Sequence, residues 1–185
     1  VVNAQAGIEM ITRRMLERAA QQKVCRMIII NKIDAPELKL PQLVADLKDA
    51  FGDECLPINL PANQGEKVID CFFNTTGDSD FGPVAKAHTK IIDQVVEVDE
   101  ALMELYLEKG DELTPEQLHE PFEKALREGH LVPICFVSAR TGANLDGWFA
   151  RVTSQEQAGG RVMDVDYAVY ADGEARLGWL NGTVQ

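Results

Sequence analysis

The sequence predicts an α/β fold in which a mostly parallel sheet is interrupted by an inserted α+β segment. Two short apolar runs carry this prediction, CRMIII at Cys25–Ile30 and LVPICFV at Leu131–Val137. Both contain β-branched residues and do not alternate with polar ones, which is typical of strands covered on both faces of a parallel sheet. Right-handed crossovers through helices would place such strands in one sheet.

The first elements follow the order strand, helix, strand, helix. Val1–Ala4 is expected to be the end of a buried strand, and apolar residues recur at helical spacing over Ile8–Gln21. After the strand at Cys25–Ile30, Leu40–Phe51 returns to helical periodicity, and Gly52 is expected to end this helix.

The alternation stops in the middle of the chain. Leu56–Leu60 and Val68–Phe73 are predicted strands, and the turn-rich link Pro61–Gly65 indicates that they form an antiparallel pair. Val84–Lys109 has the spacing of one long helix. A capping box at Thr114–Gln117 is expected to start another helix.

These elements predict the domain organisation. The parts are the first section of the α/β domain with the NKID run (1–54), the insertion (55–129), the last strand with its loop and a short helix (130–152), and a polar linker with a tail (153–185).

Composition narrows the classes of function. The chain has 185 residues, 45% of them hydrophobic, and a formal net charge of -12. This charge, with no run of Lys or Arg, disfavours autonomous nucleic-acid binding. No secretory signal and no membrane contact are predicted, because the apolar runs are far shorter than the roughly 20 residues that cross a bilayer.

The titratable and thiol side chains predict no metal site. The four cysteines form no C-x-x-C pair and have no histidine at ligand spacing, so buried, reduced thiols and a cytoplasmic protein are expected. His88, His119 and His130 fall in or beside the insertion helices and are expected at the surface or at helix caps.

The first candidate site is the run NKID, Asn31–Asp34, at the strand end where open α/β sheets bind ligands. The Asp34 carboxylate can accept hydrogen bonds from the ring N–H and the exocyclic amine of guanine, a pairing that adenine cannot match. Asn31 can tie neighbouring loops together, and Lys32 can lay its aliphatic stem over the purine. The alternative is a plain Asn-Asp turn.

The second candidate loop is Ser138-Ala139-Arg140, directly after Leu131–Val137. A backbone N–H of this loop can donate to guanine O6. Two loops at the same edge of a sheet can converge on one base. Ser138, Ala139 and Arg140 are therefore predicted to complete the guanine site.

The NKID box, the Ser-Ala pair and the segment between them together resemble bacterial elongation factor G and elongation factor G-like translational GTPases over residues 1–145. The resemblance is carried by VVNAQAGIEMITRR, CRMIIINKID, CLPINLPANQGEKVIDCFFN and EALMELYLEKGDELTPEQLHEPFEKALREGHLVPICFVSA. It implies the later half of a P-loop-GTPase-type domain, with a G-prime insertion at 55–129 and GTP or GDP as the ligand. The family varies at the position of Arg140.

The resemblance also implies partners, namely the ribosome and, for the G-prime insertion, the ribosomal stalk protein. Acidic residues of the insertion suit a partner surface that bears Lys and Arg; the candidates are Glu97, Asp99, Glu100, Glu104 and Glu108. The alternative is the solvated face of an amphipathic helix.

The hydrolytic parts of a GTPase are not found in this sequence. A P-loop needs G-x-x-x-x-G-K-[ST], and no Gly-Lys dipeptide occurs. Asp49–Gly52 matches D-x-x-G only formally, because it follows NKID and ends a predicted helix. The chain alone is expected to hold guanine without hydrolysing GTP, with Mg²⁺ bound only through the missing half of the domain.

Two other functions remain open. The tail, within residues 164–181, is faintly similar to metallochaperone GTPases of the cobalamin-synthesis type, which would make the chain part of such a protein. The other alternative is a non-catalytic protein-interaction module that uses the acidic insertion.

Overall fold

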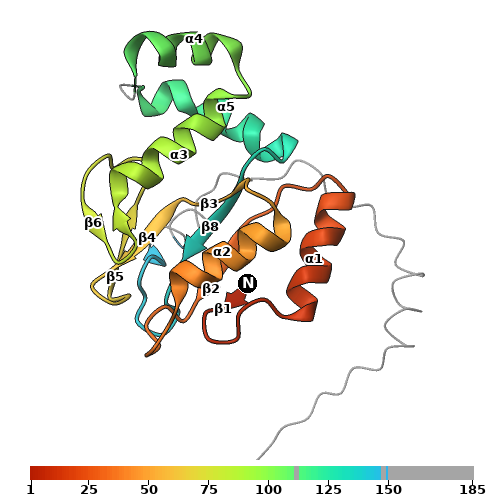
Figure 1. Ribbon diagram of the computed structural model, residues 1–185, viewed down its shortest axis with the longest axis vertical. Coiled ribbons are helices and arrows are strands. Elements are labelled where there is room, and N and C mark those ends of the chain that lie inside the picture. Colours follow the sequence, from red (N-terminus) through yellow and green to blue (C-terminus); the bar gives the residue numbers. More distant parts are fainter. Residues whose placement is uncertain (111–112, 147–148, 150–185) are drawn as a thin grey trace, which may run out of the picture. The chain divides into compact units, whose positions relative to one another are not determined.

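The computed structural model describes residues 1–110, 113–146 and 149. Its main sheet has four parallel strands in the order β1-β2-β8-β3 (Figure 1). Their bounds are β1 Val2–Asn3, β2 Ile28–Asn31, β8 Val132–Phe136 and β3 Cys55–Pro57. The predicted α/β class and its parallel sheet are therefore confirmed. Of the predicted short helix at 145–152, only residues 145, 146 and 149 are described, and the tail at 153–185 lies outside the described residues.

The two middle strands carry the centre of the core. Ile30, Ile134 and Phe136 are fully buried. Ile30 of β2 pairs with Phe136 of β8, so large apolar side chains lie next to each other across the strands. β2 ends at Asn31, the first residue of NKID, and β8 ends two residues before Ser138, which places both candidate loops at one edge of the sheet.

Two helices accompany the first part of the sheet. α2, Leu40–Phe51, has the predicted bounds, buries Leu40, Leu43, Val44 and Leu47, and lies in front of the sheet in Figure 1. Gly52 ends it at a positive φ of 112°, as expected. α1, Met10–Gln21, begins two residues later than predicted and has no buried residue. Its half-buried Leu16 packs against the core cluster.

The strand predicted at 56–60 is two strands in different sheets. β3 pairs with β8, whereas β4, Asn59–Ala62, pairs antiparallel with β5, Lys67–Asp70. The chain changes its pairing strand from β8 to β5 at Asn59. The Asn59 side chain forms hydrogen bonds with both the N–H and the carbonyl of Phe136 in β8. An antiparallel pair is confirmed, but β5 ends at Asp70, three residues before the predicted end of the strand at Phe73.

The helix predicted at 84–109 is also divided, into α3, Val84–Val96, and α4, Glu100–Lys109. The Asp99 side chain accepts a hydrogen bond from the Leu102 N–H and so caps a new helix at this point. Before α3, two short strands form a hairpin, β6 Asp78–Ser79 and β7 Gly82–Pro83.

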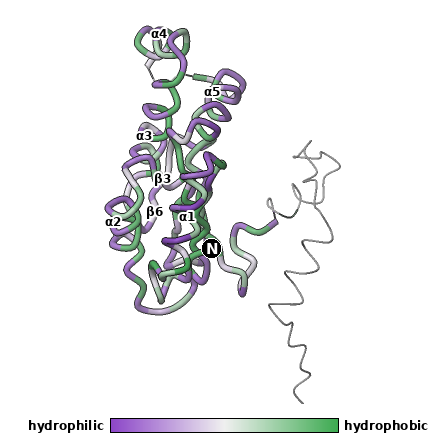
Figure 2. The backbone as a smooth tube through the Cα atoms, turned by 90° about the vertical axis from the view of Figure 1, so that its right-hand side faces the viewer, coloured by the Kyte–Doolittle hydropathy of each residue, from purple (hydrophilic) through white to green (hydrophobic). Residues whose placement is uncertain are grey.

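The last helix of the middle segment is α5, Pro115–Glu128, and its predicted capping box is confirmed. Thr114 Oγ accepts from the Gln117 N–H at 3.4 Å, and the Gln117 side chain accepts from the Thr114 N–H at 2.9 Å. Gly129 ends the helix in the left-handed conformation. Figure 2 shows hydrophilic and hydrophobic residues alternating along α4 and α5, as expected for helices with one face in solvent.

The prediction that all three histidines lie at the surface or at helix caps is wrong for His88. His88 belongs to α3 and is buried, because it lies on the apolar face of this helix with Ile91, Ile92 and Val95. Its Nδ1 lies 2.9 Å from the Cys71 carbonyl oxygen, which satisfies the ring in the core. His119 and His130 have exposed side chains.

The cysteines are free, as predicted, but not all of them are buried. Cys55 and Cys71 are buried, Cys135 is half-buried, and Cys25 is exposed. Burial raises the pKa of the Cys55 thiol to about 11 and that of Cys71 to about 12, so these two are unreactive thiols near neutral pH. Among the described residues, none of the helices is long and apolar enough to cross a membrane.

Candidate functional site

The two predicted loops meet at the carboxyl edge of the sheet. Asn31 ends β2, and Ser138 follows β8 by two residues. Because β2 and β8 are parallel neighbours, their loops leave the sheet on the same side. The Ser138 hydroxyl donates to the Asp34 carboxylate, although the two residues are 104 positions apart in the sequence.

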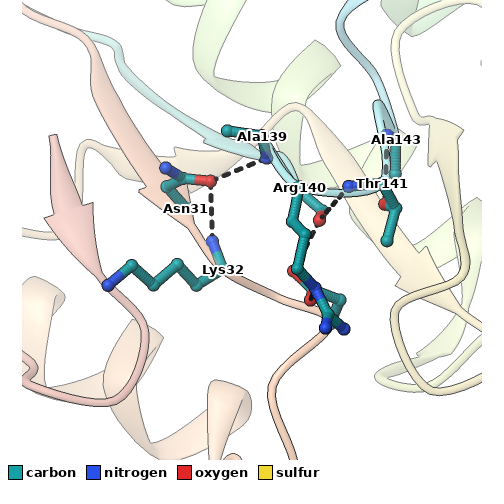
Figure 3. Close-up of polar contacts among 8 residues, drawn as sticks. Asn31, Lys32, Ala139, Arg140, Thr141 and Ala143 are labelled. Atoms are coloured by element: carbon teal, nitrogen blue, oxygen red, sulfur yellow. Dashed lines mark hydrogen bonds and ion pairs between the residues drawn. The ribbon is translucent and has the colours of Figure 1, made fainter.

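Asn31 links the two loops through one oxygen atom. Its Oδ1 accepts hydrogen bonds from the Lys32 N–H at 2.7 Å and from the Ala139 N–H at 3.0 Å (Figure 3). The first bond accompanies a left-handed backbone at Lys32, where φ is 68°. Asn31 therefore fixes the course of its own loop and its distance from the other loop, as the sequence predicts.

Asp34 is held from both sides. Oδ1 accepts from the Ser138 hydroxyl, and Oδ2 accepts from Nε of Arg140 at 2.7 Å. Only 13% of the Asp34 side chain is exposed, against 79% of the Arg140 side chain. The Ser138 hydrogen bond and, more weakly, Arg140 hold the pKa of the Asp34 carboxyl below its ordinary value, although partial burial opposes them. The carboxylate is thus ionised near neutral pH, and two hydrogen-bond donors fix its orientation.

The second loop is a tight turn around Ser138. Its buried hydroxyl also accepts from the Thr141 N–H at 3.2 Å, and its carbonyl accepts from the Gly142 N–H at 2.9 Å. Ala139 and Arg140, at the tip, are exposed. The exposed Lys32 stem and the Arg140 side chain extend in different directions from the joined loops (Figure 3). All six predicted residues therefore lie in one cluster.

A cavity of about 810 Å³ lies beside this cluster, with Asp34 and Arg140 in its wall. The turn between β4 and β5 forms another wall through Gln64, Gly65 and Glu66. No local pattern in the sequence predicts that this turn lies beside the NKID loop, because Pro61–Gly65 has only the residues typical of a turn. Within the described part of the chain, no group of His, Cys, Asp or Glu has the arrangement of a metal site.

Ser138→Ala is expected to raise the pKa of Asp34. The Ser138 hydrogen bond is the largest influence that lowers this pKa, so its removal moves the carboxyl back toward its ordinary value. Since the folded-state pKa is lowered, the Asp34 interactions stabilise the fold above the unfolded-state pKa and are lost as the pH falls through the folded-state pKa. The variant loses this stabilisation at a higher pH.

A carbon-13 NMR titration of the Asp34 carboxyl in the acid range measures the effect. Ser79→Ala is the control, because it removes a serine hydroxyl that donates to Gly82 instead of Asp34. An Asp34 pKa that is equal in wild type and Ser138→Ala would show that the hydrogen bond does not hold the carboxylate.

Comparisons with known proteins show the family of this chain. The family model described as elongation factor Tu GTP binding domain matches residues 1–165. An elongation factor G-like protein of Thermotoga maritima is 28% identical over 158 residues, which are 79% of this chain and 23% of that protein. An elongation factor G-like protein of Mycobacterium tuberculosis is 27% identical over 155 residues, which are 77% of this chain and 22% of that protein.

The fold is also similar to a solved structure. A crystal structure of a protein from Thermus thermophilus matches with a TM-score of 0.67 and 29% sequence identity, over 82% of this chain and 25% of that chain. This chain therefore spans about a quarter of the length of these proteins, or less. With a mostly parallel sheet of the P-loop GTPase type and a family match over most of its length, the chain belongs to the elongation factor Tu GTP binding domain family.

Proposed function

We propose that this chain is the guanine-recognising part of a ribosome-associated translational GTPase of the elongation factor G-like kind, working in the cytoplasm. One observation carries the proposal: two loops from neighbouring parallel strands converge on a single ionised carboxylate, Asp34, which is the acceptor that guanine requires. Family membership supports GTP or GDP as the ligand class.

Each residue of the cluster has a task in this proposal. Asp34 accepts from the ring N–H and the exocyclic amine of guanine, while the Lys32 stem covers one face of the base. Ala139 N–H already donates to Asn31, and Thr141 N–H to Ser138. Among the described contacts of this loop, the Arg140 N–H is left to donate to guanine O6.

The middle segment is proposed to be an insertion, 55–129, that binds a basic partner such as the ribosomal stalk protein. Its candidate side chains Glu97, Glu100, Glu104 and Glu108 are exposed. Asp99 is only half-exposed, and its carboxylate caps α4, so it has a structural task as well. Hydrolysis and Mg²⁺ binding are assigned to P-loop and switch residues that the sequence does not contain.

Calorimetric titration of the full chain with GDP, GMP and guanosine, each against its adenine counterpart, tests the proposal. We expect a preference for guanine with little gain from added phosphates, because every nucleotide contact proposed for these residues is to the base. No binding, or equal binding of guanine and adenine ligands, would contradict it. Binding of a basic partner without any nucleotide preference would instead favour a pure interaction module.

A further inference from the structure

The turn between β4 and β5 lies directly against the backbone of the NKID loop. A Cβ atom placed on Gly65 would overlap the carbonyl oxygen of Ile33, and it would lie 2.9 Å from the Ile33 carbonyl carbon and 3.4 Å from the Asp34 nitrogen. Both approaches to the carbonyl group are inside van der Waals contact. Position 65 of the turn therefore accommodates only glycine, because any side chain there would meet the peptide that joins Ile33 to Asp34.

The backbone of this turn is unusual. Asn63, Gln64 and Gly65 have consecutive positive φ angles of 54°, 58° and 83°. The left-handed conformation is unfavourable for Gln64 in particular, and such a conformation persists where the surroundings require it. Here the surroundings include the NKID loop, because this backbone conformation places Gly65 directly against the Ile33 carbonyl group.

The same hairpin is also fixed to the strand that leads to the second loop. Asn59, at the start of β4, is buried and bonds to both backbone groups of Phe136, two residues before Ser138. The β4–β5 hairpin therefore contacts the NKID loop at Gly65 and the strand of the Ser138 loop at Asn59. A rigid hairpin attached at both places fixes one loop relative to the other.

We propose that Gly65 is a positioning residue for guanine recognition: its close contact with the Ile33–Asp34 peptide sets the direction of the Asp34 carboxylate. This inference rests on the proposed function. A side chain at position 65 would push the Ile33 carbonyl away by about 1 Å, judged from ordinary carbon–oxygen contacts. Binding groups must be held within about 0.5 Å of the productive geometry, so the Asp34 hydrogen bonds to the base would suffer.

Gly65→Ala in the full chain tests the inference, with Gly82→Ala as its matched control. Gly82 has a φ of 109° and no atom within 4 Å of its placed Cβ, so it reports backbone strain without the contact. Affinities are measured for GDP and IDP, because hypoxanthine lacks the exocyclic amine that Asp34 accepts from. We expect Gly65→Ala to weaken GDP binding at least about tenfold and to narrow the preference for GDP over IDP. Gly82→Ala should keep both values.

A second variant covers the outcome that Gly65→Ala does not fold, which circular dichroism would show. The double variant Asn63→Gly/Gln64→Gly adds no atoms, frees the turn, and should also narrow the GDP preference. An unchanged GDP-to-IDP ratio in whichever of these variants folds overturns the inference while the proposed function stands. A wild-type chain without guanine preference overturns both.

Discussion

Asp34→Asn is expected to weaken GDP binding about 100-fold or more. The substitution keeps the size of the side chain but removes the charge from two hydrogen bonds to guanine, and a hydrogen bond to a charged group contributes about 1.5–3 kcal/mol. An amide N–H₂ also faces the base amine with a donor where an acceptor is needed. The ion pair with Arg140, 2.7 Å long, is lost as well.

The same variant should gain affinity for xanthine nucleotides. Xanthine carries a carbonyl oxygen where guanine has its amine, so the new amide can donate to it. Calorimetry with GDP and XDP on both proteins measures this exchange of preference. Asp49→Asn on α2 removes an equal charge from an exposed site, and it should leave both affinities unchanged. Equal GDP affinity in wild type and Asp34→Asn would exclude Asp34 as the guanine acceptor.

Asn59→Ala is expected to lower the free energy of unfolding by about 2–4 kcal/mol. The Asn59 side chain accepts from the Phe136 N–H at 2.7 Å and donates to its carbonyl at 3.3 Å, and it is buried. Its removal leaves the buried Phe136 N–H without this partner, which costs about 1–3 kcal/mol. The Phe136 carbonyl loses one of two donors, at a cost of about 0.5–1.5 kcal/mol, because the Asn144 side chain still donates to it at 3.2 Å.

Urea and thermal unfolding of the full chain measure this loss. For a chain of this size the expected fall in Tm is about 5–10 °C. Asn74→Ala is the control, because Asn74 is exposed and makes a single side-chain bond to the Asp70 carbonyl at 2.9 Å. A variant at position 59 that is as stable as the control would show that Asn59 does not join β4 to β8.

Local patterns predicted much of the fold and of the site. The bounds of α2, the capping box at Thr114 and the two loops at Asn31 and Ser138 all depend on residues close together in the sequence. Strand ends in a parallel sheet share an edge, so the meeting of the two loops followed from the class of the fold.

The features that were missed depend on single polar residues within apolar patterns, or on distant contacts. Asp99 divides α3 from α4 although the apolar spacing is continuous across them. Its carboxylate accepts a hydrogen bond from the Leu102 N–H and so starts a new helix there. Asn59 sits in a run with strand character, yet its side chain takes the place of a backbone partner. The contact of Gly65 with Ile33 joins two loops that no local signal relates.

The exposure of α1 has a consequence for the motions of the chain. Its main attachments are the half-buried Leu16 and the guanidinium of Arg13, which lies 5.6 Å from the ring centre of Phe51. Local unfolding of a helix with so little buried surface costs less free energy than opening the sheet. We therefore expect two levels of stability in the described part of the chain, with α1 opening and closing while β2 and β8 keep the two loops in place.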